Sequence, residues 1–280
     1  EYRQQFQATA TAFQDKYLNA DGSLTVGTPT AHALALFADL VPAKMRRATG
    51  QQLADMLAAK GNHMATGFLG TRPLLPVLSS VGHHDLATFL LQSREFPSWG
   101  YEIEQGATSI WERWDSYTKE DGFGRHNAAM NSFSHYAFGA VCEWMFRTLA
   151  GIQSDGPGYA KITIDPHPPA PGSNAQHRPI HWVKASYHSI RGEIVSEWKL
   201  DGDQFTLNVT IPTNTTATVF IPTSDPQSIR DASKTLFEGL ASGAIHLPIE
   251  TVPFEAAADA HARIEGQQTV GKLILLPPSD

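Results

Sequence analysis

Trp99-Gly-Tyr-Glu-Ile-Glu-Gln-Gly-Ala-Thr-Ser-Ile-Trp-Glu-Arg-Trp-Asp115 is the most distinctive stretch of the sequence. It places three tryptophans, one tyrosine and four acidic residues within seventeen positions. An amphipathic helix would keep the aromatic rings on one face and the carboxylates on the other, and a half-buried strand would alternate them. The segment follows neither period along its whole length, which predicts a loop. Where this loop is extended, Glu102 and Glu104 would share a face.

Aromatic rings beside carboxylates are typical of a sugar-binding site. A flat ring stacks on the apolar side of a pyranose, and carboxyl groups carry out the proton transfers of glycoside hydrolysis. Glu112 stands between Trp111 and Trp114 in the sequence and is therefore a candidate catalytic base. The structural alternative is a buried loop whose tryptophans belong to the core and whose acids pair with Arg113.

The composition restricts the class of protein. A chain of 280 residues with 41% hydrophobic and 18% charged residues is typical of a globular protein with one large or two ordinary domains. A formal charge of −7 argues against a nucleic-acid partner, and no apolar run approaches the ~18 residues that span a membrane. The single cysteine, Cys142, is expected in the core. The adjacent His83 and His84 are interpreted as surface residues, and no metal or cofactor motif is found in the sequence.

The part of the chain before Gly151 carries the apolar periodicity of helices. The helices are expected at about residues 6–17, 29–40, 43–60, 73–81, 85–93 and 134–150. The connections with unusual chemistry are residues 61–71, 97–115 and 130–135. This order predicts antiparallel helical pairs with functional loops at one end, as in a toroid. Six helices are half of a twelve-helix toroid, so one helical face is expected to lack its neighbour.

From about Tyr159 the pattern changes to short strands separated by turns. The strand-like runs are residues 161–165, 181–187, 193–200, 204–211, 217–221 and 272–276. They predict an antiparallel β-sandwich, with a hairpin at Asp201-Gly202. Gly, Ser, Asp and Pro cluster at residues 151–158, so we divide the chain into domains 1–153 and 154–280.

Four motifs together resemble the C-terminal part of bacterial α-L-rhamnosidases. They are Gly61-Asn-His-Met-Ala-Thr-Gly-Phe-Leu-Gly-Thr71, Trp99-Gly-Tyr101, Glu104-Gln-Gly-Ala-Thr-Ser-Ile-Trp-Glu-Arg-Trp-Asp115 and Met130-Asn-Ser-Phe-Ser-His-Tyr-Ala-Phe-Gly139. Members of this family are inverting glycoside hydrolases with a barrel of six helical hairpins. Residues 184–221 are similar to the β-sandwich that ends those enzymes, so the resemblance extends to about residue 225.

The resemblance implies the second half of an (α/α)6 barrel followed by an antiparallel β-sandwich. It also implies hydrolysis of terminal α-L-rhamnose with inversion, without a metal or cofactor. Glu112 matches the general base, and Glu104 is the alternative base or a residue that orients the water or the sugar. His135 matches a histidine that contacts the sugar. Further candidates for the wall of the subsite are Trp99, Trp114 and His63.

The general acid of that family lies in an earlier Asp-Glu-Arg-containing motif, which this sequence lacks. We therefore expect the chain to supply only the base side of the site, and the isolated chain to be nearly inactive. Its partners would be a rhamnose-containing glycoside or polysaccharide and the N-terminal half of the enzyme, as a separate or missing segment. No nucleic acid or membrane is expected as a partner, and a periplasmic or extracellular location is favoured over the cytoplasm.

Two alternatives remain from the sequence. A carbohydrate-binding or scaffold protein would use Trp99, Trp111 and Trp114 to hold sugar without chemistry. A related (α/α)6-barrel glycosidase or phosphorylase would act on another sugar.

Overall fold

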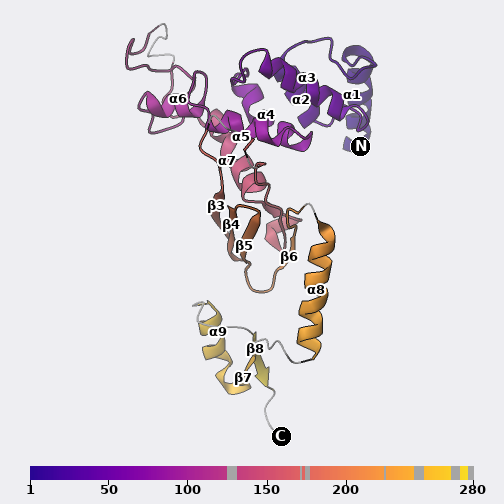
Figure 1. Cartoon of the computed structure of the whole chain (residues 1–280), viewed down its shortest axis with the longest axis vertical. Helices are drawn as coiled ribbons and strands as arrows, with labels where there is room; N and C mark the ends of the chain where they lie inside the picture. The colour runs from indigo at the N-terminus through magenta and orange to yellow at the C-terminus, as the bar shows by residue number, and fades with distance from the viewer. Residues whose placement is uncertain are drawn as a thin grey trace. The chain divides into compact units, whose positions relative to one another are not determined.

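Six helices follow one another in the first part of the chain (Figure 1). They are α1 (Tyr2–Tyr17), α2 (Pro29–Phe37), α3 (Arg46–Ala58), α4 (Phe68–Ser80), α5 (His84–Gln92) and α6 (Trp99–Glu104). The computed structural model describes residues 1–124, 131–170, 172–173, 177–223, 225–242, 249–265 and 272–276. Helix α4 packs against α2, α3 and α5 and is therefore at the centre of the helical part.

Local sequence explains where several of these helices begin. Thr28 caps α2 by accepting a hydrogen bond from the Ala31 N–H at 3.2 Å, and Pro29 occupies the first turn. Helix α4 begins five residues before its predicted start at Pro73, and that proline lies inside the helix. An internal proline removes a helical hydrogen bond. The helix forms nevertheless, because Leu74 and Leu75, the two residues after Pro73, are completely or almost completely buried.

The last helical run, predicted at 134–150, changes its winding along its length. A 3-10 turn (Tyr136–Ala140), α7 (Val141–Trp144) and a π turn (Met145–Leu149) follow one another. Only the face that carries Phe138, Trp144 and Leu149 is buried. Cys142, which was expected in the core, lies outside this face and is exposed, so that expectation was wrong.

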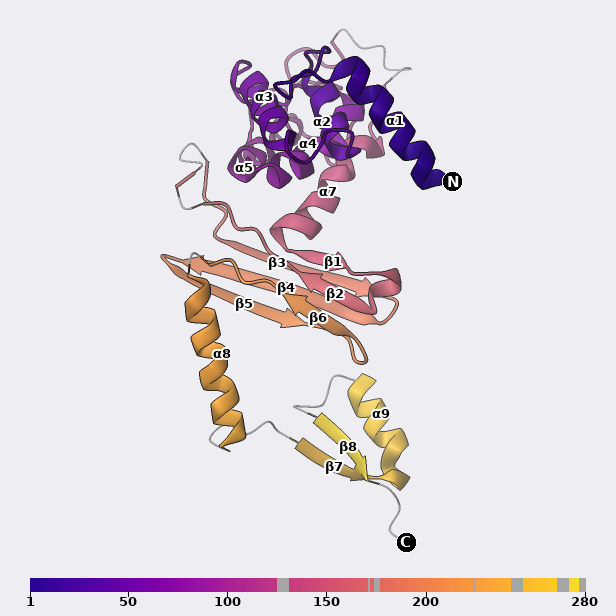
Figure 2. The ribbon, with the colours of Figure 1, turned by 90° about the vertical axis from the view of Figure 1, so that its right-hand side faces the viewer.

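Two sheets follow and share one apolar core (Figure 2). The first has the order β1-β2-β6, and the second the order β3-β4-β5. Their strands are β1 (Ile152–Ser154), β2 (Lys161–Ile164), β6 (Thr216–Val219), β3 (Trp182–Ser189), β4 (Gly192–Asp201) and β5 (Gln204–Thr210). The predicted hairpin at Asp201-Gly202 joins β4 to β5, where Asp201 pairs with Gln204. The strands β2 and β6 are parallel, because the whole β3-β5 meander separates them in the chain. The other strand pairs of these two sheets are antiparallel, as predicted.

Residues Thr223–Asp280 form a compact unit of their own, separate from Glu1–Pro222. This unit contains α8 (Pro226–Ala241), β7 (Ile249–Pro253), α9 (Ala257–Glu265) and β8 (Lys272–Leu276). The predicted strand at 272–276 is β8, and it pairs in parallel with β7. Neither helix was predicted from the sequence.

Buried hydrogen bonds join the helical part to the sheets within Glu1–Pro222. The Ser196 hydroxyl donates to the Ala150 carbonyl at 2.6 Å, and the Trp198 Nε1–H donates to the Leu149 carbonyl at 2.7 Å. Both donors lie on β4 and are buried, whereas both acceptors end the last helical run. The sheet is therefore fixed to the end of that helix through its backbone. No helix in the described parts of the chain is long and apolar enough to cross a membrane.

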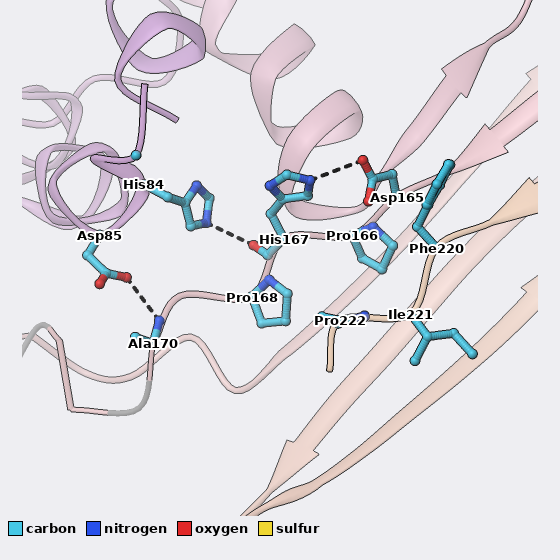
Figure 3. Close-up of a pocket in the computed structure, with 11 residues that line it drawn as sticks. His84, Asp85, Asp165, Pro166, His167, Pro168, Ala170, Phe220, Ile221 and Pro222 are labelled. Carbon is cyan, nitrogen blue, oxygen red and sulfur yellow. Dashed lines mark hydrogen bonds and ion pairs between the residues drawn. The ribbon is translucent and has the colours of Figure 1, made fainter. Parts of the chain in front are cut away.

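His84 forms a second connection across this seam, so its interpretation as a surface residue was wrong (Figure 3). Its Nε2 lies 2.8 Å from the His167 carbonyl, which only accepts, so Nε2 carries the proton. Its Nδ1 lies 3.0 Å from the Ser79 hydroxyl, and that hydroxyl also accepts from the Trp144 Nε1–H at 3.0 Å. Burial lowers the pKa of His84, so the imidazole is neutral at pH 7. A neutral imidazole that carries its proton on Nε2 accepts the Ser79 hydroxyl hydrogen at Nδ1.

A cavity of ≈ 440 Å³ lies beside this histidine. In its lining, Asp165 pairs with His167 at 3.2 Å, and Asp85 accepts from the Ala170 N–H at 2.9 Å (Figure 3). Residues 220–222 also line the cavity. None of the predicted site residues lines this cavity.

The neutral His84 predicts a pH dependence of stability. The unfolded histidine takes up its proton near its ordinary pKa of about 6.5, and the folded one only at lower pH. The contribution of neutral His84 to the free energy of unfolding is therefore complete above about pH 6.5. It is lost as the pH falls toward the pKa of the folded state. Replacement His84→Gln keeps a donor near His167 but cannot titrate. Between pH 7 and 5, we expect the Tm of the original chain to fall roughly 2–4 °C more than that of the variant, measured by circular dichroism.

His83→Gln is the matched control, since the described residues show no hydrogen bond or ion pair of the His83 side chain across the seam. If His83→Gln abolishes the pH dependence and His84→Gln does not, the assignment of the titrating group is incorrect.

Candidate active site

The segment after α6 pairs with the segment before the last helical run. The Glu112 N–H donates to the Ser132 carbonyl at 2.9 Å, and the His135 N–H donates to the Ile110 carbonyl at 2.8 Å. These strand-like contacts join two loops that are separated by about twenty residues in the sequence. They place Glu112 and His135, the predicted base and sugar contact, on adjacent segments.

A backbone hydrogen bond orients the Glu112 side chain. The Ser132 N–H donates to Glu112 Oε2 at 2.9 Å, so these two residues are joined in both directions. A backbone donor restricts the carboxylate more strongly than a mobile side chain would, because it loses little entropy on forming the bond. The side chain is half-buried and keeps access to the surface. Glu112 thus combines a fixed orientation with accessibility, as a catalytic carboxylate requires.

Three aromatic rings of this region pack against one another. Trp114 stacks on Phe138 with ring centroids 3.8 Å apart and planes at 6°. Trp99 meets Trp114 edge-on at 5.2 Å, and its Nε1–H donates to the Phe138 carbonyl at 3.1 Å. All three side chains are at most 8% exposed. Trp99 and Trp114, the predicted walls of the subsite, therefore belong to the hydrophobic core in this structure.

Helix α6 separates the two carboxylates that were expected to share a face. Residues two apart on a helix point about 200° apart. Glu102 is 2% exposed, whereas the Glu104 side chain is 48% exposed and pairs with Arg94 at 3.0 Å. The condition for a shared face, an extended chain, is not met here, because Ser98 caps a helix by accepting from the Tyr101 N–H at 3.0 Å.

Glu102 is the residue of this region that the sequence reasoning left without a role. It lies three positions after Trp99, so both occupy the buried face of α6. Desolvation raises the pKa of Glu102 to about 8, and the carboxyl group is therefore protonated at neutral pH. Once Trp99–Glu104 is recognised as a helix, the spacing of three residues from Trp99 predicts that Glu102 lies on the same buried face.

The loop 61–71 reaches the same region. The Phe68 ring, at the start of α4, lies 5.9 Å from the His135 ring. His63, from the same loop, has its Nε2 3.6 Å from a carboxylate oxygen of Glu95. The structure therefore brings Phe68 to His135, while His63 makes its ionic contact with Glu95.

Several buried polar atoms in these loops have no partner in the described parts of the chain. They are His63 Nδ1, Glu102 Oε1, Trp114 Nε1 and His135 Nδ1. Only two such atoms occur elsewhere in the described residues, on His32 and His177. Leaving a buried polar atom unpaired costs about 1–3 kcal/mol. This clustering indicates that further groups, from a ligand or from more protein, complete the site. Among the described residues, no group of three or more acidic, histidine or cysteine side chains is arranged to hold a metal ion.

A carboxylate held in one orientation by a backbone N–H, in the loops of a helical array, is what one member of the carboxyl pair of a glycoside hydrolase would look like. Comparison with family models supports this class. Residues 1–149 match the bacterial alpha-L-rhamnosidase 6 hairpin glycosidase domain, and residues 151–235 match the bacterial alpha-L-rhamnosidase C-terminal domain. The chain therefore belongs to the bacterial α-L-rhamnosidase family, as its motifs indicated, and the predicted fold class is confirmed.

Individual relatives agree. An α-L-rhamnosidase of Streptomyces avermitilis is 40% identical over 82% of this chain, and one of Formosa agariphila is 38% identical over 82%. The crystal structure of the Streptomyces enzyme with L-rhamnose covers 81% of the chain with a TM-score of 0.74 and 40% identity. That of the native Aspergillus terreus enzyme covers 79%, with a TM-score of 0.71 and 30% identity.

The chain is much shorter than these relatives. The matched part is 21% of the length of the Streptomyces enzyme and 24% of the Formosa enzyme. In the crystal structures it is 21% of the Streptomyces chain and 25% of the Aspergillus chain. The homology therefore concerns one part of a longer enzyme.

The buried Glu102 predicts a stability that falls with rising pH. The unfolded carboxyl loses its proton near its ordinary pKa of 4.5, but the folded one keeps it up to about 8. The contribution of neutral Glu102 to the free energy of unfolding is therefore complete below pH 4.5. It is lost as the pH rises from 4.5 to about 8. We expect Glu102→Gln, which is neutral at every pH, to raise the free energy of unfolding by roughly 1–3 kcal/mol at pH 8 and by much less at pH 5.

Urea unfolding at the two pH values measures this difference. The matched control is Glu104→Gln on the same helix, which should change stability by no more than about 0.5 kcal/mol because Glu104 is half-exposed. An equal gain in both variants, or a larger gain at pH 5, is the result that contradicts the buried neutral carboxyl.

Proposed function

We propose that this chain supplies the general-base side of an inverting α-L-rhamnosidase site, with Glu112 as the base. The observation that carries the proposal is the Ser132 N–H bond to Glu112 Oε2 at 2.9 Å. In the reaction, a water molecule attacks the anomeric carbon and gives its proton to Glu112. The glycosidic oxygen leaves with a proton from a general acid, and the products are inverted rhamnose and the free alcohol.

L-Rhamnose is the sugar we propose for this site. The Streptomyces relative was crystallised with L-rhamnose, and its structure covers 81% of this chain. We assign contact with the sugar to His135, whose Nδ1 is buried without a partner in the described chain. Glu104, the alternative base, is held by Arg94 on the exposed face of α6. This ion pair favours Glu112 over Glu104 as the base.

The general acid in this proposal comes from the upstream part of the six-hairpin domain. An apolar cavity of ≈ 380 Å³ between α1 and α2 supports this, because such a surface is suited to a further apolar helix. Its lining includes Phe13, Tyr17, Leu34, Phe37 and Leu40. Leu34 and Phe37 are each more than 40% exposed. The upstream half, as a separate or a continuous segment, is therefore the protein partner that we propose.

Replacement Glu112→Gln tests the assignment of the base. The substitution keeps the shape of the side chain but cannot accept the proton of the water. In an enzyme completed with the upstream half, from its parent or from the Streptomyces relative, we expect kcat on an aryl α-L-rhamnoside to fall by at least about 10³-fold. Glu104→Gln should stay within about tenfold of the original enzyme.

Rhamnose binding, measured by calorimetry, should survive in the Glu112→Gln enzyme. If only Glu104→Gln abolishes turnover, the base is Glu104. If the completed protein binds rhamnose but shows no turnover even without substitution, the chain belongs to a binding protein without chemistry. A panel of chromogenic glycosides separates rhamnose from other sugars.

The isolated chain provides a separate test. Without a proton donor for the leaving group, the 280 residues alone should hydrolyse an aryl α-L-rhamnoside at least about 10³-fold more slowly than the completed enzyme. Intact mass must be measured on the same sample, to exclude contaminating full-length enzyme. Rapid turnover by the pure isolated chain would disprove the division of the site between two segments.

A further inference from the structure

Two side chains beside Glu112 form a closed set of hydrogen bonds. The Asn131 Nδ2–H donates to the Ser116 carbonyl at 2.8 Å, and the Ser116 hydroxyl donates to Asn131 Oδ1 at 2.7 Å. The same hydroxyl accepts from the Arg113 N–H at 3.1 Å. Ser116 is completely buried, so water does not compete for these bonds. We call the two residues the Ser116–Asn131 clamp.

The clamp acts on both segments that hold the proposed base. Arg113 directly follows Glu112, and Asn131 directly precedes Ser132. Two hydrogen bonds join Glu112 to Ser132, and the clamp adds further bonds at the neighbouring residues, Arg113 and Asn131. The Ser116 N–H also donates to the Arg113 carbonyl at 3.2 Å, which closes the turn after Glu112. A movement of either segment relative to the other breaks bonds of the clamp.

We propose that Ser116 and Asn131 are positioning residues for Glu112. This inference rests on the proposed function of Glu112 as general base. Neither side chain needs to touch the sugar, because the clamp fixes the position of the Ser132 N–H, and this N–H holds Glu112 Oε2. The other oxygen, Oε1, then takes the proton of the attacking water. A displacement of about 1 Å of such a group lowers the rate by roughly 100-fold.

A kinetic test separates positioning from general stability. In the completed enzyme, Ser116→Ala, Asn131→Ala and the double variant should each lower kcat by about 10- to 100-fold, with KM within about threefold. The double variant should lose no more than the worse single variant, because either substitution already opens the clamp. The matched control is Asn19→Ala, since Asn19 donates to the Ser23 hydroxyl at 2.8 Å in an exposed turn. The control should leave kcat unchanged.

A second measurement uses the 280-residue chain and does not depend on activity. The Glu112 and Ser132 amides both donate hydrogen bonds between the two segments. Asn131→Ala should accelerate hydrogen exchange of both amides by at least about tenfold, as for a local opening. Amides of α3 should keep their exchange rates in the same variant, and Asn19→Ala should accelerate neither loop amide.

The outcomes are distinguishable. Unchanged exchange of the Glu112 and Ser132 amides in Asn131→Ala overturns the clamp as a positioning device, whatever the activity. Normal kcat in the clamp variants of an enzyme that requires Glu112 overturns it as well. A normal kcat in Glu112→Gln overturns the proposed function itself, and the inference with it. Accelerated exchange, together with a loss of kcat at nearly constant KM, supports the inference.

Discussion

The candidate site depends on the pairing of two short segments, residues 110–113 and 131–135. Backbone hydrogen bonds join Glu112 to Ser132 in one place and Ile110 to His135 in another. Side-chain hydrogen bonds alone would fix these loops less well, because each such bond must offset the conformational entropy that two side chains lose on being ordered. Each of the two segments leads into the core through an aromatic residue, because Trp114 and Phe138 follow them in the chain and stack on each other. The backbone pairing and this buried stack together restrict the orientation of Glu112.

A second constraint is that buried polar atoms and apolar faces require partners. The described chain leaves unpaired nitrogen atoms on His63, Trp114 and His135, and it exposes Leu34 and Phe37 beside an apolar cavity. Both features would destabilise a domain that was complete in itself. The proposed upstream partner would account for both features. The chain spans about a fifth of the length of the relatives it matches, and the family domain has six hairpins.

The sheets contribute to this arrangement through the end of the last helical run. Strand β4 donates from Ser196 and Trp198 to carbonyl groups at the end of that run, so the run is fixed at its far end. The same run begins with the residues that follow His135, and Phe138 within it stacks on Trp114. His84 adds a neutral imidazole between α5 and the His167 carbonyl. The sandwich thus fixes the helical run that follows the loops of the candidate site.

Local patterns in the sequence determined most helices, the β4–β5 hairpin and the motifs of the site, because caps, turns and periodicity act over a few residues. The identity of the loops that meet also followed from the motifs. Only the tertiary structure decided that Glu102 is buried while Glu104 faces solvent, since the buried face of α6 is set by Trp114 and Phe138, which lie far along the chain. The pairing of Ser116 with Asn131 is likewise a contact between distant segments. No local pattern encodes such a contact, because it exists only when the core has brought the two loops together.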